Sequence, residues 1–111
     1  MWISETNNQP ITKFQASVYK LISRIPSGKI STYQQVARGL KNPRAARAVG
    51  NALNRNPFAP EVPCHRIIKS NGAVGGFADG TKKKIAMLRK ERVEIKKGKI
   101  NLDKYLYVFP K

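Results

Sequence analysis

The chain has 111 residues, which is enough for one domain with a modest hydrophobic core and too few for two. It carries 22 lysine and arginine residues against 6 aspartate and glutamate residues, a formal net charge of +16 at pH 7. No apolar run is long enough to cross a bilayer, and the N-terminus lacks the pattern of a secretory signal. The single cysteine and single histidine exclude an internal disulfide and a zinc site with four Cys or His ligands. We therefore expect a soluble, intracellular protein that binds no metal. We also expect a cytoplasmic monomer that uses no cofactor.

The basic residues are spread along nearly the whole chain. Cations that neutralise phosphates release condensed counterions, so a polyanion is the first partner to expect. Runs such as Lys82-Lys83-Lys84 and Lys96-Lys97 could simply be solvated faces, but an excess this large favours nucleic acid. A membrane surface fits less well, because no predicted helix opposes a basic face to a large aromatic one.

Two capped helices are predicted after an irregular lead-in over residues 1–11. Thr12 and Gln15 form a capping-box pattern, and Pro26-Ser27-Gly28 ends the helix that follows. A second cap pairs either Ser31 with Gln34 or Thr32 with Gln35. The apolar positions at helical spacing are Phe14, Val18, Leu21, Ile22 and Ile25 in the first helix, and Tyr33, Val36, Ala37 and Leu40 in the second.

A third helix is predicted over about residues 43–54, with Asn42 as its cap and Pro43 at its first position. Its apolar stripe would be Ala45, Ala48, Val49, Ala52 and Leu53. The opposite face carries Ala46, Arg47, Gly50, Asn51 and Asn54, which are short apart from the arginine. Such a slim face suits either a close helix contact or insertion into the DNA minor groove, which is narrower than a helix with long side chains.

The remaining chain predicts a loop-rich second half. Residues 56–63 are proline-rich, residues 64–69 form a short extended or turn segment, and a glycine-rich loop over residues 72–80 could line a pocket. A last helix is predicted over about 81–92 and a tail or small hairpin over 93–111. The predicted fold is mainly α: a single domain, 1–111, with a three-helix, winged-helix-like (helix-turn-helix) DNA-binding core, an active-site loop, a further helix and a short C-terminal hairpin.

The only cysteine, Cys64, stands next to the only histidine, His65. A thiolate is the competent nucleophile, and an imidazole held by a carboxylate can take the thiol proton. Neighbouring side chains often point apart, so this pair needs a turn or a helix start to converge. Glu91 and Glu61 are both candidates for the carboxylate. Because cysteine is also among the most often buried residues, inert packing is an equally good interpretation of Cys64 at this point.

The run Pro63-Cys64-His65-Arg66-Ile67-Ile68 resembles the active-site signature of the O6-alkylguanine-DNA alkyltransferases, also called methylated-DNA–protein-cysteine methyltransferases. Other segments agree in order and spacing from about Phe14 to Glu91, the family's C-terminal catalytic domain. They are 31–37 (Ser-Thr-Tyr-Gln-Gln-Val-Ala), 42–50 (Asn-Pro-Arg-Ala-Ala-Arg-Ala-Val-Gly), 54–57 (Asn-Arg-Asn-Pro) and 70–77 (Ser-Asn-Gly-Ala-Val-Gly-Gly-Phe).

This resemblance implies a role for each matching residue in the repair of O6-alkylguanine, and possible repair of O4-alkylthymine stays open. Cys64 would accept the alkyl group irreversibly, with His65 as the base, Glu91 as its carboxylate and Asn56 bracing the turn before them. The protein would bind double-stranded DNA in the minor groove and flip the damaged base out of the helix. The DNA contacts would come from Tyr33, Ala46, Arg47 and Arg66, and Arg47 would replace the flipped base. The base pocket would be lined by Tyr33, Ile67, Val74, Phe77 and Ala78. The protein would act once, as a single-turnover methyltransferase associated with the nucleoid.

Two departures from the family pattern stand out: only about a dozen residues precede the first helix, and Ala78 stands where some relatives have serine. The main alternative is an alkyltransferase-like protein, which recognises damage without accepting the alkyl group, but in those proteins the cysteine is replaced. A helix-turn-helix regulator would be expected to read the major groove with longer polar side chains. A cysteine hydrolase would explain neither the charge nor the three helices.

Overall fold

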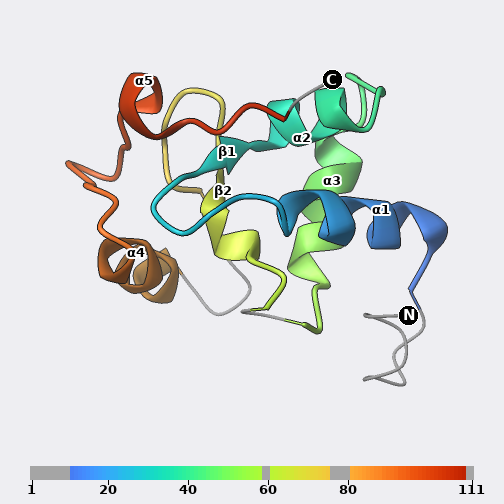
Figure 1. Ribbon diagram of the computed structural model, residues 1–111, viewed down its shortest axis with the longest axis horizontal. Coiled ribbons are helices and arrows are strands. Elements are labelled where there is room, and N and C mark those ends of the chain that lie inside the picture. The colour runs from blue at the N-terminus through green and yellow to red at the C-terminus, as the bar shows by residue number, and fades with distance from the viewer. Residues whose placement is uncertain (1–10, 59–60, 76–80, 110–111) are drawn as a thin grey trace.

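The computed structural model describes residues 11–58, 61–75 and 81–109 and is mainly helical, as predicted (Figure 1). None of the helices in these ranges is long and apolar enough to cross a membrane. Figure 1 shows a short pair of strands between a three-helix group on the right and the last two helices on the left. In chain order, the elements are α1 (Lys13–Ile22), β1 (Ser31–Thr32), α2 (Tyr33–Gly39), α3 (Ala46–Asn54), the 3₁₀ helix η1 (Cys64–Arg66), β2 (Ile67–Ile68), α4 (Thr81–Lys90) and α5 (Leu102–Tyr105).

The first two helices begin at capped positions. At α1 the capping box is complete, with the Gln15 backbone N–H donating to Thr12 Oγ1 at 3.0 Å and the Thr12 N–H donating to Gln15 Oε1 at 2.9 Å. At α2 the cap is Thr32, whose hydroxyl accepts from the Gln35 N–H at 3.1 Å. Ser31, the other candidate, donates instead to the carbonyl of Tyr107 at 2.9 Å.

The start of α3 differs from the prediction. The segment from Asn42 to Ala45 forms a turn, with the Ala45 N–H donating to the Asn42 carbonyl at 3.0 Å, and the helix begins at Ala46 without a side-chain cap. Ala48, predicted in the apolar stripe, is exposed, because α3 turns Val49, Ala52 and Leu53 toward α1 and α2. The three helices nevertheless pack on one another as predicted.

Two hydrophobic clusters meet at the strand pair, which the sequence predicted only as a short extended segment. Strands β1 and β2 are parallel, with Ser31 opposite Ile67 and Thr32 opposite Ile68. Successive strand residues face opposite sides. Accordingly, Ile67 packs in the first core with α1, α2 and α3, whereas Ile68 packs in the second core with Ile30, Leu88 and the C-terminal segment. The strand pair thus fixes where the chain leaves η1.

The C-terminal segment only partly matches the predicted hairpin. Lys96 and Lys99 form an antiparallel bridge around a two-residue turn whose central residues, Lys97 and Gly98, both have positive φ. The short helix α5 follows, and the Tyr107 N–H then donates to the Ile30 carbonyl at 2.6 Å. The tail therefore closes the second core beside β1.

Candidate active site

Cys64 begins the 3₁₀ helix η1, directly after Pro63. The Arg66 N–H donates to the Pro63 carbonyl at 2.9 Å, and the Ile67 N–H donates to the Cys64 carbonyl. A tight helical turn of this kind is the local structure that an adjacent Cys-His pair needs in order to act together. The site is largely shielded from solvent, since Cys64 is 6 % and His65 2 % exposed.

Glu91, just beyond the end of α4, contacts the two residues that follow Cys64. His65 Nε2 lies 3.0 Å from Glu91 Oε2. Arg66 binds the same carboxylate with two nitrogens, Nε to Oε1 at 2.9 Å and Nη2 to Oε2 at 2.6 Å. Glu61, the other candidate for the carboxylate, is exposed instead. Of the two carboxylates left open by the residue pattern, Glu91 is therefore the one placed against the imidazole.

Arg66 lies differently from the DNA contact that the sequence predicted. Its remaining terminal nitrogen, Nη1, donates to the Ile25 carbonyl at 2.7 Å, just after the end of α1. All three guanidinium nitrogens are thus directed at groups of the protein itself. This arrangement ties α1, η1 and the end of α4 together through one side chain.

The tautomer of His65 follows from its partner. An ionised carboxylate only accepts hydrogen bonds, so Nε2 carries the proton and Nδ1 carries the lone pair. Nδ1 is buried and has no hydrogen-bond partner among the described residues. Burial lowers the pKa of His65 below 6.5 and outweighs the opposite effect of Glu91. A neutral imidazole with an available basic nitrogen is therefore the state at neutral pH.

The charge of Glu91 is set by competing effects. Burial acts to raise its pKa, but the hydrogen bonds from Arg66 and His65 outweigh burial, and the net shift lies below the ordinary value of 4.5. Glu91 therefore remains a carboxylate, which keeps both of its donors in place.

Asn56 braces the chain between α3 and the active-site turn. Its side-chain amide donates to the Val62 carbonyl at 2.9 Å and accepts from the Phe58 N–H at 2.9 Å. Val62 is two residues before Cys64, so the end of the helix that presents Arg47 is linked directly to the turn that holds the thiol.

Tyr33, the first residue of α2, lies between α3 and the glycine-rich loop. A Cβ atom added at Gly50 would lie 3.8 Å from the Tyr33 ring, and one at Gly75 would lie 3.8 Å from its hydroxyl. Burial, and secondarily the charge of a Cys64 thiolate, raises the pKa of Tyr33. Its hydroxyl is therefore a neutral donor near the thiol.

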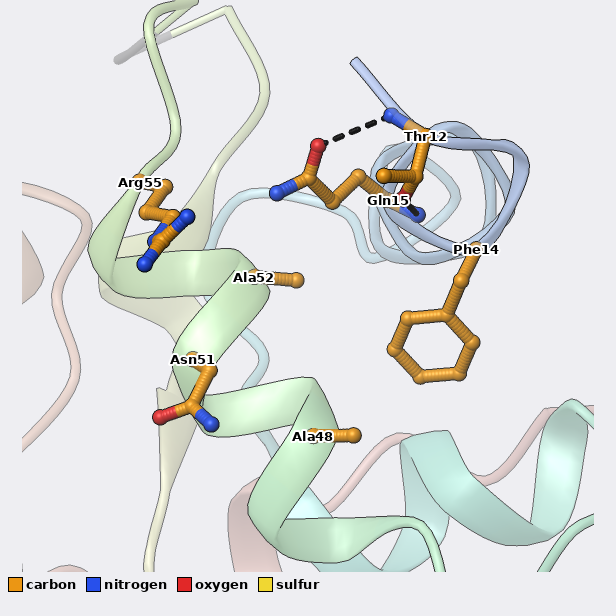
Figure 2. A pocket seen from close by; sticks show the side chains of 7 residues that line it. All are labelled: Thr12, Phe14, Gln15, Ala48, Asn51, Ala52 and Arg55. Carbon is orange, nitrogen blue, oxygen red and sulfur yellow. Dashed lines mark hydrogen bonds between the residues drawn. The ribbon is translucent and has the colours of Figure 1, made fainter.

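The outer face of α3 is exposed at Arg47, Ala48, Asn51 and Asn54, and so is Arg55 just after the helix, while Ala46 and Gly50 are half-buried. This face continues into a groove of about 260 Å³ between α3 and the start of α1 (Figure 2). The groove is lined by Thr12, Phe14, Gln15, Ala48, Asn51, Ala52 and Arg55. It shares no residue with the predicted base pocket.

The predicted base pocket is only partly within the described residues. Ile67 and Val74 are buried, and Val74 packs in the second core with its N–H on the Gly98 carbonyl at 3.0 Å. Phe77 and Ala78 lie outside the described residues. The structure therefore brings Tyr33, Cys64, His65 and Glu91 to one region, and the side of the pocket formed by residues 76–80 stays a prediction.

Lys84 contacts the segment directly after η1, and the sequence analysis missed this contact. It was grouped with Lys82 and Lys83 as a possible solvated face, but it is 1 % exposed and its Nζ donates to the Ile67 carbonyl at 2.6 Å. The available signal was helical spacing, since Lys84, Leu88 and Glu91 follow one another at intervals of four and three.

Comparison with known proteins identifies a matching family and several similar proteins. Residues 13–93 match the family described as 6-O-methylguanine DNA methyltransferase, DNA binding domain. A methylated-DNA–protein-cysteine methyltransferase of Methanosarcina mazei is 47 % identical over 85 residues, covering 77 % of this chain and 54 % of that protein. One from Saccharolobus islandicus is 44 % identical over 93 residues, covering 84 % and 60 %. The chain thus spans little more than half the length of these curated relatives.

The chain is also similar to two solved structures, and it covers a different share of each. Schizosaccharomyces pombe Atl1, in complex with damaged DNA containing O6-carboxymethylguanine, superposes with a TM-score of 0.79 at 33 % identity, covering 89 % of this chain and 98 % of that one. Mycobacterium tuberculosis OGT in complex with DNA has a TM-score of 0.73 at 41 % identity, covering 75 % and 52 %.

Replacing Arg66 with methionine should destabilise the fold by about 3 kcal/mol, because it leaves a mostly buried carboxylate without its main partner. Urea denaturation at neutral pH measures this change. The control is Arg89→Met on the exposed side of α4, which should change stability by less than about 0.5 kcal/mol. Equal, small effects of both substitutions would show that the Arg66–Glu91 contact does not hold the site together.

Acid should destabilise the protein in two steps. The folded state binds fewer protons than the unfolded chain just below pH 6.5, because the pKa of His65 is lowered, so stability falls as pH decreases through that window. The lowered pKa of Glu91 adds a second loss below pH 4.5. Melting temperatures measured from neutral to acid pH check this, and His65→Gln should remove the first step alone. A first step that persists in that variant would assign it to another group.

Proposed function

The chain belongs to the O6-methylguanine DNA methyltransferase family, and we propose that it repairs DNA by transferring the alkyl group of O6-alkylguanine to Cys64. The observation that carries the proposal is that Cys64 begins η1 and is followed by His65, whose imidazole Nε2 is held by Glu91. A protein that only recognised damage would not need the thiol.

The transfer balances without a cofactor. The Cys64 proton passes through a water molecule to His65 Nδ1, and the thiolate attacks the alkyl carbon. The sulfur–carbon bond forms as the bond from carbon to O6 breaks, and guanine recovers the proton at N1 or O6. The product is a thioether, which has no easy route back to the thiol, so each molecule would act once.

Reaching O6 requires the base to leave the helix. Flipping a nucleotide costs roughly a few kcal/mol, and less for a base whose pairing is already weakened. The minor groove is about 6 Å wide, whereas a helix with its side chains is about 10–12 Å across. The short side chains on the outer face of α3 suit insertion into that groove, with Arg47 filling the gap and Tyr33 contacting the flipped guanine.

The positive charge suits this mode of binding. With a net charge of +16, the protein should bind duplex DNA chiefly through phosphates. Its affinity should therefore depend weakly on DNA sequence and strongly on salt concentration. Within this proposal the protein acts as a monomer in the cytoplasm, associated with the nucleoid. Arg66 serves as a positioning residue for Glu91 rather than as a phosphate contact.

A damage-recognition protein without transfer is the second candidate, because the match to Atl1 extends over 98 % of that chain. The two functions differ in what happens to Cys64. We favour transfer because Cys64 is accompanied by the His65–Glu91 pair.

Incubation with duplex DNA containing one O6-methylguanine should add one methyl group per protein, on Cys64, and leave guanine in the DNA. Intact-mass measurement with peptide mapping detects both products. Cys64→Ser, the matched control, should still bind the lesion but gain no mass. Tight binding by the wild type without a mass gain would support recognition alone, and transfer by the serine variant would refute the role of Cys64.

Replacing Arg47 with alanine should slow repair in duplex DNA about tenfold or more, because the flipped state loses the group that fills the stack. Reaction with a free O6-alkylguanine base, which needs no flipping, should change little. Arg24→Ala removes the same charge at an exposed position outside α3 and serves as the control. Equal losses on both substrates would contradict the role of Arg47 in flipping.

A further inference from the structure

Lys84 is buried, although the two lysines directly before it on α4 are not. It is 1 % exposed, whereas Lys82 and Lys83 are exposed on the same helix. A charged side chain is rarely placed inside a protein unless other groups compensate its lost hydration. The groups around the ammonium of Lys84 must therefore compensate its lost hydration.

The ammonium group of Lys84 is anchored on the turn that holds the thiol. Its Nζ donates to the Ile67 carbonyl at 2.6 Å, and the N–H of the same Ile67 bonds to the carbonyl of Cys64. Helix α4 packs against η1 along this contact. The cation is thereby held at a fixed place relative to Cys64 by two consecutive backbone contacts.

The charged and titratable groups that influence Lys84 come from η1 and the residues after β2. Burial lowers the pKa of Lys84 to about 8, a Cys64 thiolate acts to raise it, and Lys69 acts to lower it. Lys84 in turn contributes to the lowered pKa of His65. With a pKa of about 8, Lys84 still carries its proton in most molecules at pH 7.

The other cations around η1 are occupied or neutral. Arg66 is bound to Glu91 and Ile25, and His65 is neutral at neutral pH. Lys69 is exposed, where water and salt weaken its effect. In cysteine enzymes that pair a thiolate with an imidazolium, the histidine supplies the positive charge. Here the histidine does not carry that charge in the resting state.

We infer that Lys84 is the cation that stabilises the Cys64 thiolate, a role that rests on the proposed transfer by Cys64. In the resting protein the thiol proton leaves through His65 to solvent, from which guanine later takes up a proton, and the ammonium group compensates the negative charge that remains on sulfur. Lys84 contacts neither substrate nor the alkyl carbon in this scheme, so it is a positioning residue. Its effect is to increase the fraction of molecules that hold the nucleophile ready.

The test is the pKa of Cys64 in the protein without DNA. Because the chain has one cysteine, the ultraviolet absorbance of the thiolate as a function of pH, with Cys64→Ser as the blank, reports this residue alone. In Lys84→Met the pKa of Cys64 should rise by about one unit, which lowers the thiolate fraction about tenfold on the acid side. Lys84→Arg, which keeps the charge, should stay near the wild type.

The matched control is Lys82→Met, which removes the same charge from the exposed side of α4 and should leave the pKa of Cys64 unchanged. If Lys84 only supported the Ile67 carbonyl, Lys84→Met would lower stability without moving the thiol titration. Equal thiol pKa values in the two methionine variants would therefore overturn the inference.

A reciprocal measurement covers the case in which Lys84→Met does not fold. Coupling between two sites acts equally in both directions. The pKa of Lys84, measured by NMR on protein labelled at lysine, should thus be lower in Cys64→Ser than in the wild type, and an unchanged value would refute the pairing. Neither titration uses DNA. Methyl transfer by the wild type with unshifted titrations would overturn this inference alone, whereas absence of transfer would overturn the proposed function.

Discussion

The carboxylate of Glu91 is the group on which the geometry around Cys64 depends. It accepts hydrogen bonds from His65 and Arg66, and Arg66 also donates to the carbonyl of Ile25. Three segments far apart in sequence, the end of α1, η1 and the end of α4, therefore meet at a single charge that is 16 % exposed. Burial makes such a charge costly unless donors surround it, so the same contacts that keep Glu91 ionised also fix the orientation of the imidazole.

The strand pair and two polar contacts connect this cluster to the helix that would meet DNA. Ile67 packs with the three helices and Ile68 with the C-terminal segment, so β2 is held from both sides. Within the first core, the Tyr19 hydroxyl donates to the Ala52 carbonyl of α3 at 2.7 Å, and Asn56 links the end of α3 to Val62. Under the proposed function, a displacement of α3 on DNA would be passed through these contacts to the turn that carries the thiol.

Local chemistry explains which parts of this structure the sequence could predict. The caps at Thr12 and Thr32 depend on residues three apart, and both are found. The start of α3 was misplaced because Asn42-Pro43 is equally suited to the turn that the structure contains. Two-residue strands show no periodicity. The Arg66–Glu91 pair depends on a contact between residues 25 apart, which neither composition nor spacing reveals. Helical spacing places Lys84 on the same face of α4 as Leu88, but its partner, the Ile67 carbonyl 17 residues earlier, could not be predicted from that spacing.

A strongly basic surface cannot by itself keep the thiolate stable at the moment of reaction. Surface lysines and arginines are screened by salt, and when DNA binds, its phosphates neutralise the same cations that favoured an anion in the unbound protein. The negative potential of the duplex then acts against a thiolate. A cation inside the protein, as Lys84 is, makes no direct contact with those phosphates and would keep its effect in the complex. Burying Lys84 costs free energy. We infer that this cost is tolerated because the nucleophile has to remain charged beside a polyanion.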